Sequence, residues 1–127
     1  MTDKLTGSLL VEKTFVYIST LTRECRKALT TKFERDYRGI PFETIEPTMK
    51  KEVEEWFNAR DKHIKLGHTQ TVSGNSGEMN LTFSGETKDS HFKINVNSLF
   101  TVIESSGKKL SYLKSLNVNA DKRDFTK

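Results

Sequence analysis

The sequence predicts an α+β fold, in which two N-terminal helices, one of them long, pack on a C-terminal antiparallel β-meander of four to five strands. Three observations lead to this prediction. Up to Gly67, apolar residues recur at steps of three, four and seven, which is the spacing of one helix face. After His68, apolar and polar residues alternate, as they do along a half-buried strand. Clusters of glycine, asparagine and serine separate the alternating segments.

Length and composition indicate one folded domain. The chain has 127 residues, of which 30% are charged and 34% hydrophobic, and its patterned aromatics argue against disorder. We expect a polar arm over 1–7, a helical part over 8–67, a sheet over 68–118 and a polar basic tail over 119–127. Because no apolar run has the length of a signal peptide core or a membrane span, we expect a cytoplasmic protein that does not bind a membrane.

The first helix should extend from Ser8, as N-cap, to Arg38, with Gly39 as its stop. Such a helix is about 45 Å long, whereas a compact domain of this size has a radius of gyration of about 14 Å. It should therefore overhang, bend, or lie along a second subunit, unless the second helix and the sheet each cover one strip of it. The apolar stripe comprises Val11, Phe15, Ile18, Cys25, Leu29 and Phe33, with Leu10, Thr14, Tyr17, Leu21 and Ala28 beside it.

The second helix should begin near Pro47, since proline suits the first turn of a helix. Gly67 is the expected end. The face turned to the core would contain Met49, Val53, Trp56, Phe57, His63 and Ile64.

The alternating segments predict strands over 69–73, 78–84, 91–97 and 110–118, with a turn over 74–77. Residues 98–106 fit either a continuation of the third strand or a short helix capped by Ser98, and their β-branched residues favour the strand. The expected inward residues are Met79, Leu81, Phe83, Phe92, Ile94, Val96, Leu110, Tyr112, Leu116 and Val118.

The opposite face of this sheet should be small, polar and nearly uncharged. It carries no aromatic residue in this register, which argues against base stacking and against a sugar-binding platform. We therefore expect a solvated face. Its residues would include Asn80, Thr82, Lys93, Asn95, Asn97, Ser111, Ser115 and Asn117.

No catalytic constellation is visible, so we expect no enzyme, no cofactor and no metal site. His63, His68 and His91 lack the spacing and the cysteine partners of a zinc site. Cys25 lies on the apolar stripe and should fill core space. Most carboxylates stand four residues from a lysine or arginine, which gives ion pairs rather than proton donors.

The charge and the long helix indicate a binding protein. Net charge is +4, with the basic excess in segments 23–38 and 108–127, and the sequence leaves open whether these merge into one patch. We expect a non-catalytic adaptor, inhibitor or assembly subunit that binds a protein and forms a homodimer or larger assembly through the first helix. The alternative is a nucleic-acid-binding protein without sequence specificity. The candidate binding residues are Arg23, Arg26, Lys27, Arg35, Arg38, Lys108 and Lys109.

Overall fold

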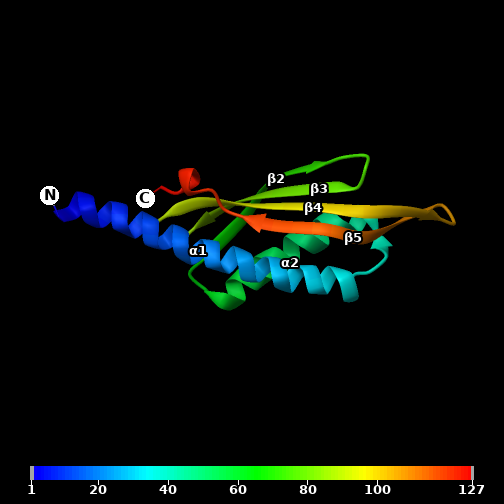
Figure 1. Cartoon of the computed structure of the whole chain (residues 1–127), viewed down its shortest axis with the longest axis horizontal. Helices are drawn as coiled ribbons and strands as arrows, with labels where there is room; N and C mark the ends of the chain where they lie inside the picture. Colours follow the sequence, from blue (N-terminus) through cyan, green and yellow to red (C-terminus); the bar gives the residue numbers. More distant parts are fainter. Residues whose placement is uncertain (1, 127) are drawn as a thin grey trace.

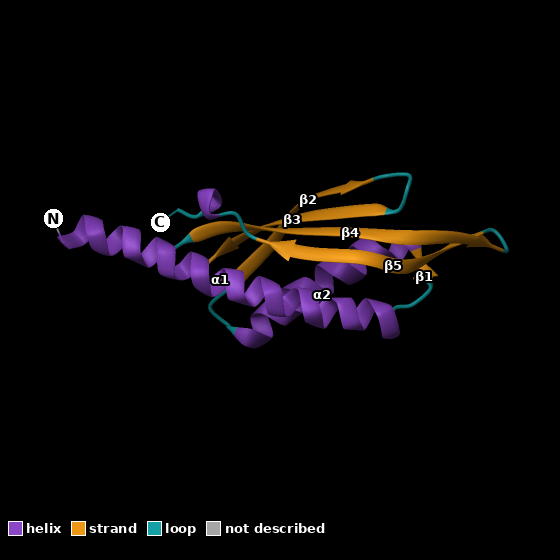
Figure 2. Ribbon diagram, in the orientation of Figure 1, coloured by secondary structure: helices purple, strands orange, loops and turns teal. Residues whose placement is uncertain are grey.

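The computed structural model describes residues 2–126, and for residues 2–10 it describes the backbone alone. Both long helices lie on one side of a curled antiparallel sheet, which confirms the predicted α+β class (Figures 1 and 2). The sheet has five strands in the order β1-β5-β4-β3-β2. The elements are α1 (Thr2–Arg35), β1 (Ile40–Pro41), the 3-10 helix η1 (Phe42–Thr44), α2 (Ile45–Arg60), β2 (Lys65–Ser73), β3 (Glu78–Glu86), β4 (His91–Ser105), β5 (Lys108–Asn119) and the 3-10 helix η2 (Lys122–Asp124).

Helix α1 begins at Thr2, six residues earlier than predicted. The polar arm expected over 1–7 is therefore wrong for residues 2–7, and Met1 lies outside the described residues. Ser8 lies inside the helix and is not its N-cap; its side chain also lies outside the described part. No proline interrupts residues 2–10, so nothing in the local sequence stops the helix there. With 34 residues, α1 is about 51 Å long.

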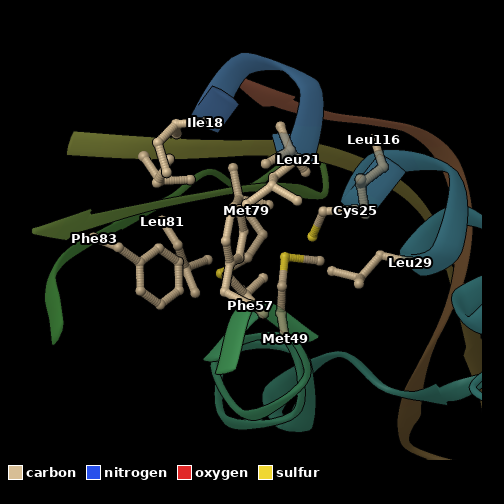
Figure 3. Packing of buried hydrophobic residues seen from close by; sticks show 14 of the residues in the cluster. Ile18, Leu21, Cys25, Leu29, Met49, Phe57, Met79, Leu81, Phe83 and Leu116 are labelled. Atoms are coloured by element: carbon tan, nitrogen blue, oxygen red, sulfur yellow. The ribbon is translucent and has the colours of Figure 1, made fainter. Parts of the chain in front are cut away.

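The core lies between α1, α2 and the inner face of the sheet (Figure 3). The predicted stripe of α1 is buried from Ile18 onward, and the predicted inward residues of β3 and of the first half of β4 are buried as well. The residues buried in this core are Ile18, Leu21, Cys25, Leu29, Phe33, Ile45, Met49, Val53, Phe57, Ile64, Met79, Leu81, Phe83, Phe92, Ile94, Val96, Phe100, Leu116, Val118 and Phe125.

Helix α2 ends at Arg60, not at Gly67, which lies inside β2. The carboxylate of Asp61 accepts a hydrogen bond from the backbone N–H of His63, and this local turn competes with another helical turn. Ile64 still reaches the core, but from the turn, and His63 is exposed there rather than on the inner face of the helix.

Residues 98–105 continue the strand β4, which is the alternative that the sequence favoured over a short helix. β4 continues to Ser105 and joins β5 through a two-residue turn. Ser106 and Gly107 both have positive φ, 51° and 78°, which is the geometry of the type I′ hairpin turn. The 15 residues of β4 span about 50 Å, close to the length of α1.

A β-bulge reverses the predicted orientation of the first half of β5. The partner of Leu99 is Ser115 and that of Phe100 is Leu113, so Lys114 has no partner on β4. Leu116 and Val118 face inward as predicted. Before the bulge, Ser111 and Leu113 face inward, whereas Leu110 and Tyr112 face outward, which is the opposite of the prediction. Alternation fails here because one additional residue changes which side chains share a face.

The connection between α1 and α2 contains the short strand β1. Ile40 pairs with Ser111, and the N–H of Gly39 donates to the carbonyl oxygen of Ser111 at 2.8 Å. Helix α1 ends at Arg35, three residues before the predicted end, so Gly39 is not its stop, and the φ of +77° at Gly39 belongs to the turn that leads into β1. Ile40 and Phe42 pack against the core.

The predicted polar tail over 119–127 begins with the last residue of β5, and residues 120–126 pack against α1 and β4. Phe125 is buried, with its ring 5.3 Å from that of Phe15 and 5.2 Å from that of Phe92. Thr126 bridges to His91, and Lys122 forms an ion pair with Glu12 at 3.3 Å. Lys127 lies outside the described residues.

Glu52 on α2 joins the two helices. Its carboxylate accepts hydrogen bonds from Lys32 at 2.7 Å and from Tyr37 at 2.5 Å. Burial by itself raises the pKa of Glu52, but these two hydrogen bonds outweigh burial, and the pKa is lowered from its ordinary value. A carboxyl whose pKa is lower in the folded state stabilises the fold above its unfolded pKa of about 4.3, and this stabilisation is lost as the pH falls through the folded pKa.

We predict that Glu52→Gln lowers the free energy of unfolding by about 1–3 kcal/mol at pH 7, because it removes charge-assisted hydrogen bonds. The difference from wild type should shrink below about pH 4, where wild-type Glu52 also becomes protonated. Urea unfolding across a pH series measures both effects. Glu55→Gln is the matched control on the same helix, because the ion pair of Glu55 with Lys51 at 3.9 Å is exposed. A constant difference down to pH 3 would contradict this role of Glu52.

Two buried serines give opposite predictions. Ser98 Oγ donates to the carbonyl oxygen of Met79 at 2.6 Å, whereas Ser111 Oγ has no hydrogen-bond partner among the described residues. Ser98→Ala should therefore destabilise the protein by about 1 kcal/mol, and Ser111→Ala should stabilise it by a similar amount. Thermal and urea unfolding of both variants measure the sign. A destabilising effect of Ser111→Ala would show that its hydroxyl has a partner.

Candidate binding surfaces

The basic residues predicted on the first helix lie on its exposed side. Arg23, Arg26 and Lys27 line one shallow hollow together with Thr20 and Glu24. Within residues 11–126, no ion pair involves any of these three cations, and the one hydrogen bond recorded for them joins Arg23 to Thr20 at 3.4 Å. This part of α1 can therefore receive an anionic group from outside.

The other predicted basic residues lie near the far end of α1. Arg35 is exposed in the last turn, and the guanidinium of Arg38 lies 5.3 Å from the centre of the Tyr112 ring. Lys108 and Lys109 line a hollow beside the β4–β5 turn. This hollow shares no lining residue with the one on the middle of α1, so the candidate residues occupy separate places along the molecule.

An exposed apolar residue at Val16 was not predicted, whereas Tyr17 was expected beside the apolar stripe. Val16 is 58% exposed and Tyr17 43% exposed, and together with Glu12 and Lys13 they line a mostly apolar hollow. The hydroxyl of Tyr17 donates to the carboxylate of Asp61 at 2.9 Å, which fixes this ring beside the end of α2. The sequence contained an indication of this surface. Helical spacing places Val16 opposite the buried stripe, on the face of the helix where charged and polar residues are usual.

The outer face of the sheet carries two rows of uncharged side chains, which we call the amide rows. Pairing between strands places directly opposed residues on the same face of a sheet. The predicted outward positions of β3 and β4 are confirmed, whereas Ser111 is buried and Tyr112 takes its place outside. The first row is Gln70, Thr82, Asn95 and Asn119, and the second is Val72, Asn80, Asn97 and Asn117.

The titratable residues are dispersed. Cys25 is fully buried, and burial raises the pKa of its thiol to about 12. His68 contacts Thr71, and His91 lies 3.7 Å from Glu86. Among the described residues, no group of three or more histidine, cysteine, aspartate or glutamate side chains is arranged to hold a metal ion. In the same part of the chain, neither long helix is apolar enough to cross a bilayer.

Comparisons with protein-family models, with curated proteins and with solved structures found no match to this chain.

We predict that Cys25 does not react with the thiol reagent DTNB at pH 8 in the folded protein, because a buried thiol with a pKa of about 12 supplies almost no thiolate. Labelling should proceed only as the protein opens, and should become fast in concentrated urea. Absorbance of the released thionitrobenzoate measures the rate. Rapid and complete labelling without denaturant would contradict the burial of Cys25.

Proposed function

We propose that this protein is a small non-catalytic binding protein that acts through protein contacts and self-associates through α1. The observation that carries the proposal is the N-terminal part of α1, which extends beyond the sheet (Figure 1). Among the side chains of residues 11–35, the first that is fully buried is Ile18, and Val11 and Phe15 are partly buried against the core.

The extension continues a helix that is already formed, but most helix stability in proteins comes from packing of an apolar face rather than from propensity. A partner that covers the extension would supply this packing. The proposal therefore explains why a helix of about 51 Å is retained on a small body.

The hollow at Val16 and Tyr17 lies where the extension leaves the body, on the side of α1 turned away from the core. Two copies of α1 that cross antiparallel near Val16 would each place their extension along the exposed side of the other. Such an interface uses the same patch on both copies, as two-fold dimers do. An adaptor, an inhibitor or an assembly subunit would all be compatible with it.

The alternative, nucleic-acid binding without sequence specificity, draws support from the cations Arg23, Arg26 and Lys27, which form no ion pair with the side chains of residues 11–126. It is the weaker proposal, because Lys108 and Lys109 lie in a different hollow from these three residues. The dependence of binding on salt concentration distinguishes the two proposed functions. Added salt weakens binding to phosphates, whereas it screens the repulsion between two copies of a basic protein.

We predict that Val16→Glu abolishes self-association, because it places a charge at the centre of the proposed contact. Analytical ultracentrifugation at millimolar protein should give a mass near twice 14.6 kDa for wild type and near 14.6 kDa for the variant. Val72→Glu is the matched control, since Val72 is 54% exposed, like Val16, but lies on the sheet. A wild-type protein that stays monomeric, or a control that dissociates equally, would refute self-association through α1.

A further inference from the structure

The amide rows are an improbable arrangement for a sheet that is merely solvated. Five of the seven asparagines in the chain lie in these rows, at positions 80, 95, 97, 117 and 119. Asparagine is depleted in β-strands, and these five lie on the three central strands of the sheet rather than at turns. Direct pairing joins Asn80 to Asn97, Asn97 to Asn117, and Asn95 to Asn119. Residues that oppose local propensity commonly mark functional sites.

Solubility does not explain the rows. Lysine, glutamate and threonine solvate an exposed sheet face as well, and threonine also favours the strand. Charged residues make up 30% of the whole chain, so about two of the eight row positions would be charged if the rows had the average composition. None of the eight is charged. The rows thus combine a high density of hydrogen-bonding groups with the absence of charge.

These groups are available to a ligand. Asn97 and Asn117 are exposed, and Asn80, Asn95 and Asn119 are half-buried. Within residues 11–126, one hydrogen bond joins two side chains of the rows, from Thr82 Oγ1 to Asn95 Oδ1 at 3.3 Å. Each side-chain amide carries two N–H donors and one oxygen acceptor. Neither α1 nor α2 covers this face, since both lie on the other side of the sheet (Figure 2).

We propose that the amide rows bind a neutral oligosaccharide. Sugar hydroxyls both donate and accept hydrogen bonds, so they match amide groups that do the same, and an uncharged ligand suits a surface without charge. Neighbouring strands lie about 4.8 Å apart, so a glycan chain laid across β3, β4 and β5 would meet a new pair of polar side chains at intervals close to the length of one sugar ring. Each pair consists of two asparagines on β4 and on β5, and of Asn80 and Thr82 on β3.

The bulge on β5 removes the sequence-based objection to this ligand. That objection rested on a face without aromatic residues. Tyr112 pairs with Thr101 on the outer face, four residues along β4 from Asn97. One aromatic side chain is therefore present on the same face as the rows, beyond the second row, although the guanidinium of Arg38 lies against its ring.

Other occupants fit the rows less well. A second copy of the chain would need an apolar centre to its interface, and Val72 is the one apolar residue in the two rows. A nucleic acid would need cations for its phosphates, and the rows contain none. The glycan site lies on the side of the sheet away from α1, so it is independent of the proposed self-association.

Amide NMR signals test the proposal directly. Cellohexaose, maltohexaose and chitohexaose would each be titrated to millimolar concentration into 15N-labelled protein, with a heparin hexasaccharide as the charged comparison. We expect at least one neutral hexasaccharide to give saturable shifts in the side-chain NH2 signals of the five row asparagines. The signals of Asn58 and Asn75, which lie outside the rows, serve as internal controls and should not move.

The double variant Asn97→Thr/Asn117→Thr should weaken this binding by about tenfold or more, because it removes two amides at the centre of the rows. Threonine favours strands, so the variant should fold, and its melting temperature verifies this. Three outcomes would overturn the proposal: no saturable shift with any neutral hexasaccharide, unchanged affinity in the double variant, or stronger shifts of the row amides with heparin. Shifts of these signals with protein concentration alone would also overturn it, since they would assign the rows to a second copy.

Discussion

The buried stripe of α1 is the constraint on which the rest of the structure depends. Ile18, Cys25, Leu29 and Phe33 are almost completely buried along one continuous line of the helix, and no single neighbour encloses a helix stripe of this width. The inner face of the sheet covers one side of the stripe and α2 the other. Glu52 then fixes the two helices to each other through Lys32 and Tyr37. The long strands β4 and β5 follow from this, because they must extend along the helix that they cover.

This arrangement uses one face of the sheet and leaves the other uncovered. Both helices lie on the same side, so the amide rows and the exposed side of α1 point away from a shared core (Figure 2). The two surfaces also differ in chemistry. The hollow at Val16 and Tyr17 is mostly apolar, whereas the rows are polar and uncharged. A partner on one surface would leave the other accessible, which is a useful property in a protein that joins two partners.

Sequence reasoning predicted the type and order of the main elements, because long stretches of helical spacing and of strict alternation are strong signals. It failed where a single hydrogen bond or a single additional residue determines where an element ends or which way its side chains point. The hydrogen bond from His63 to Asp61 ends α2 early, and the bulge at Lys114 exchanges the faces of Ser111 and Tyr112. Of the candidate surfaces, the basic residues were identified but not their separation, since spacing along the chain does not give distance in space. Four of the five outward asparagines were predicted from alternation alone, whereas Asn119 was assigned to the tail, and the pairing of these residues across strands required the register.

The attachment of the last residues to α1 affects how the chain folds as it is synthesised. Glu12 and Lys122 are separated by 110 positions, yet they form an ion pair, and Phe125 packs on Phe15. The N-terminal half of the helix leaves the ribosome first but gains these contacts after the whole sheet has been made. Until Phe125 has been synthesised, the ring of Phe15 lacks this contact, and apolar surface that is exposed in this way favours aggregation of incompletely folded chains.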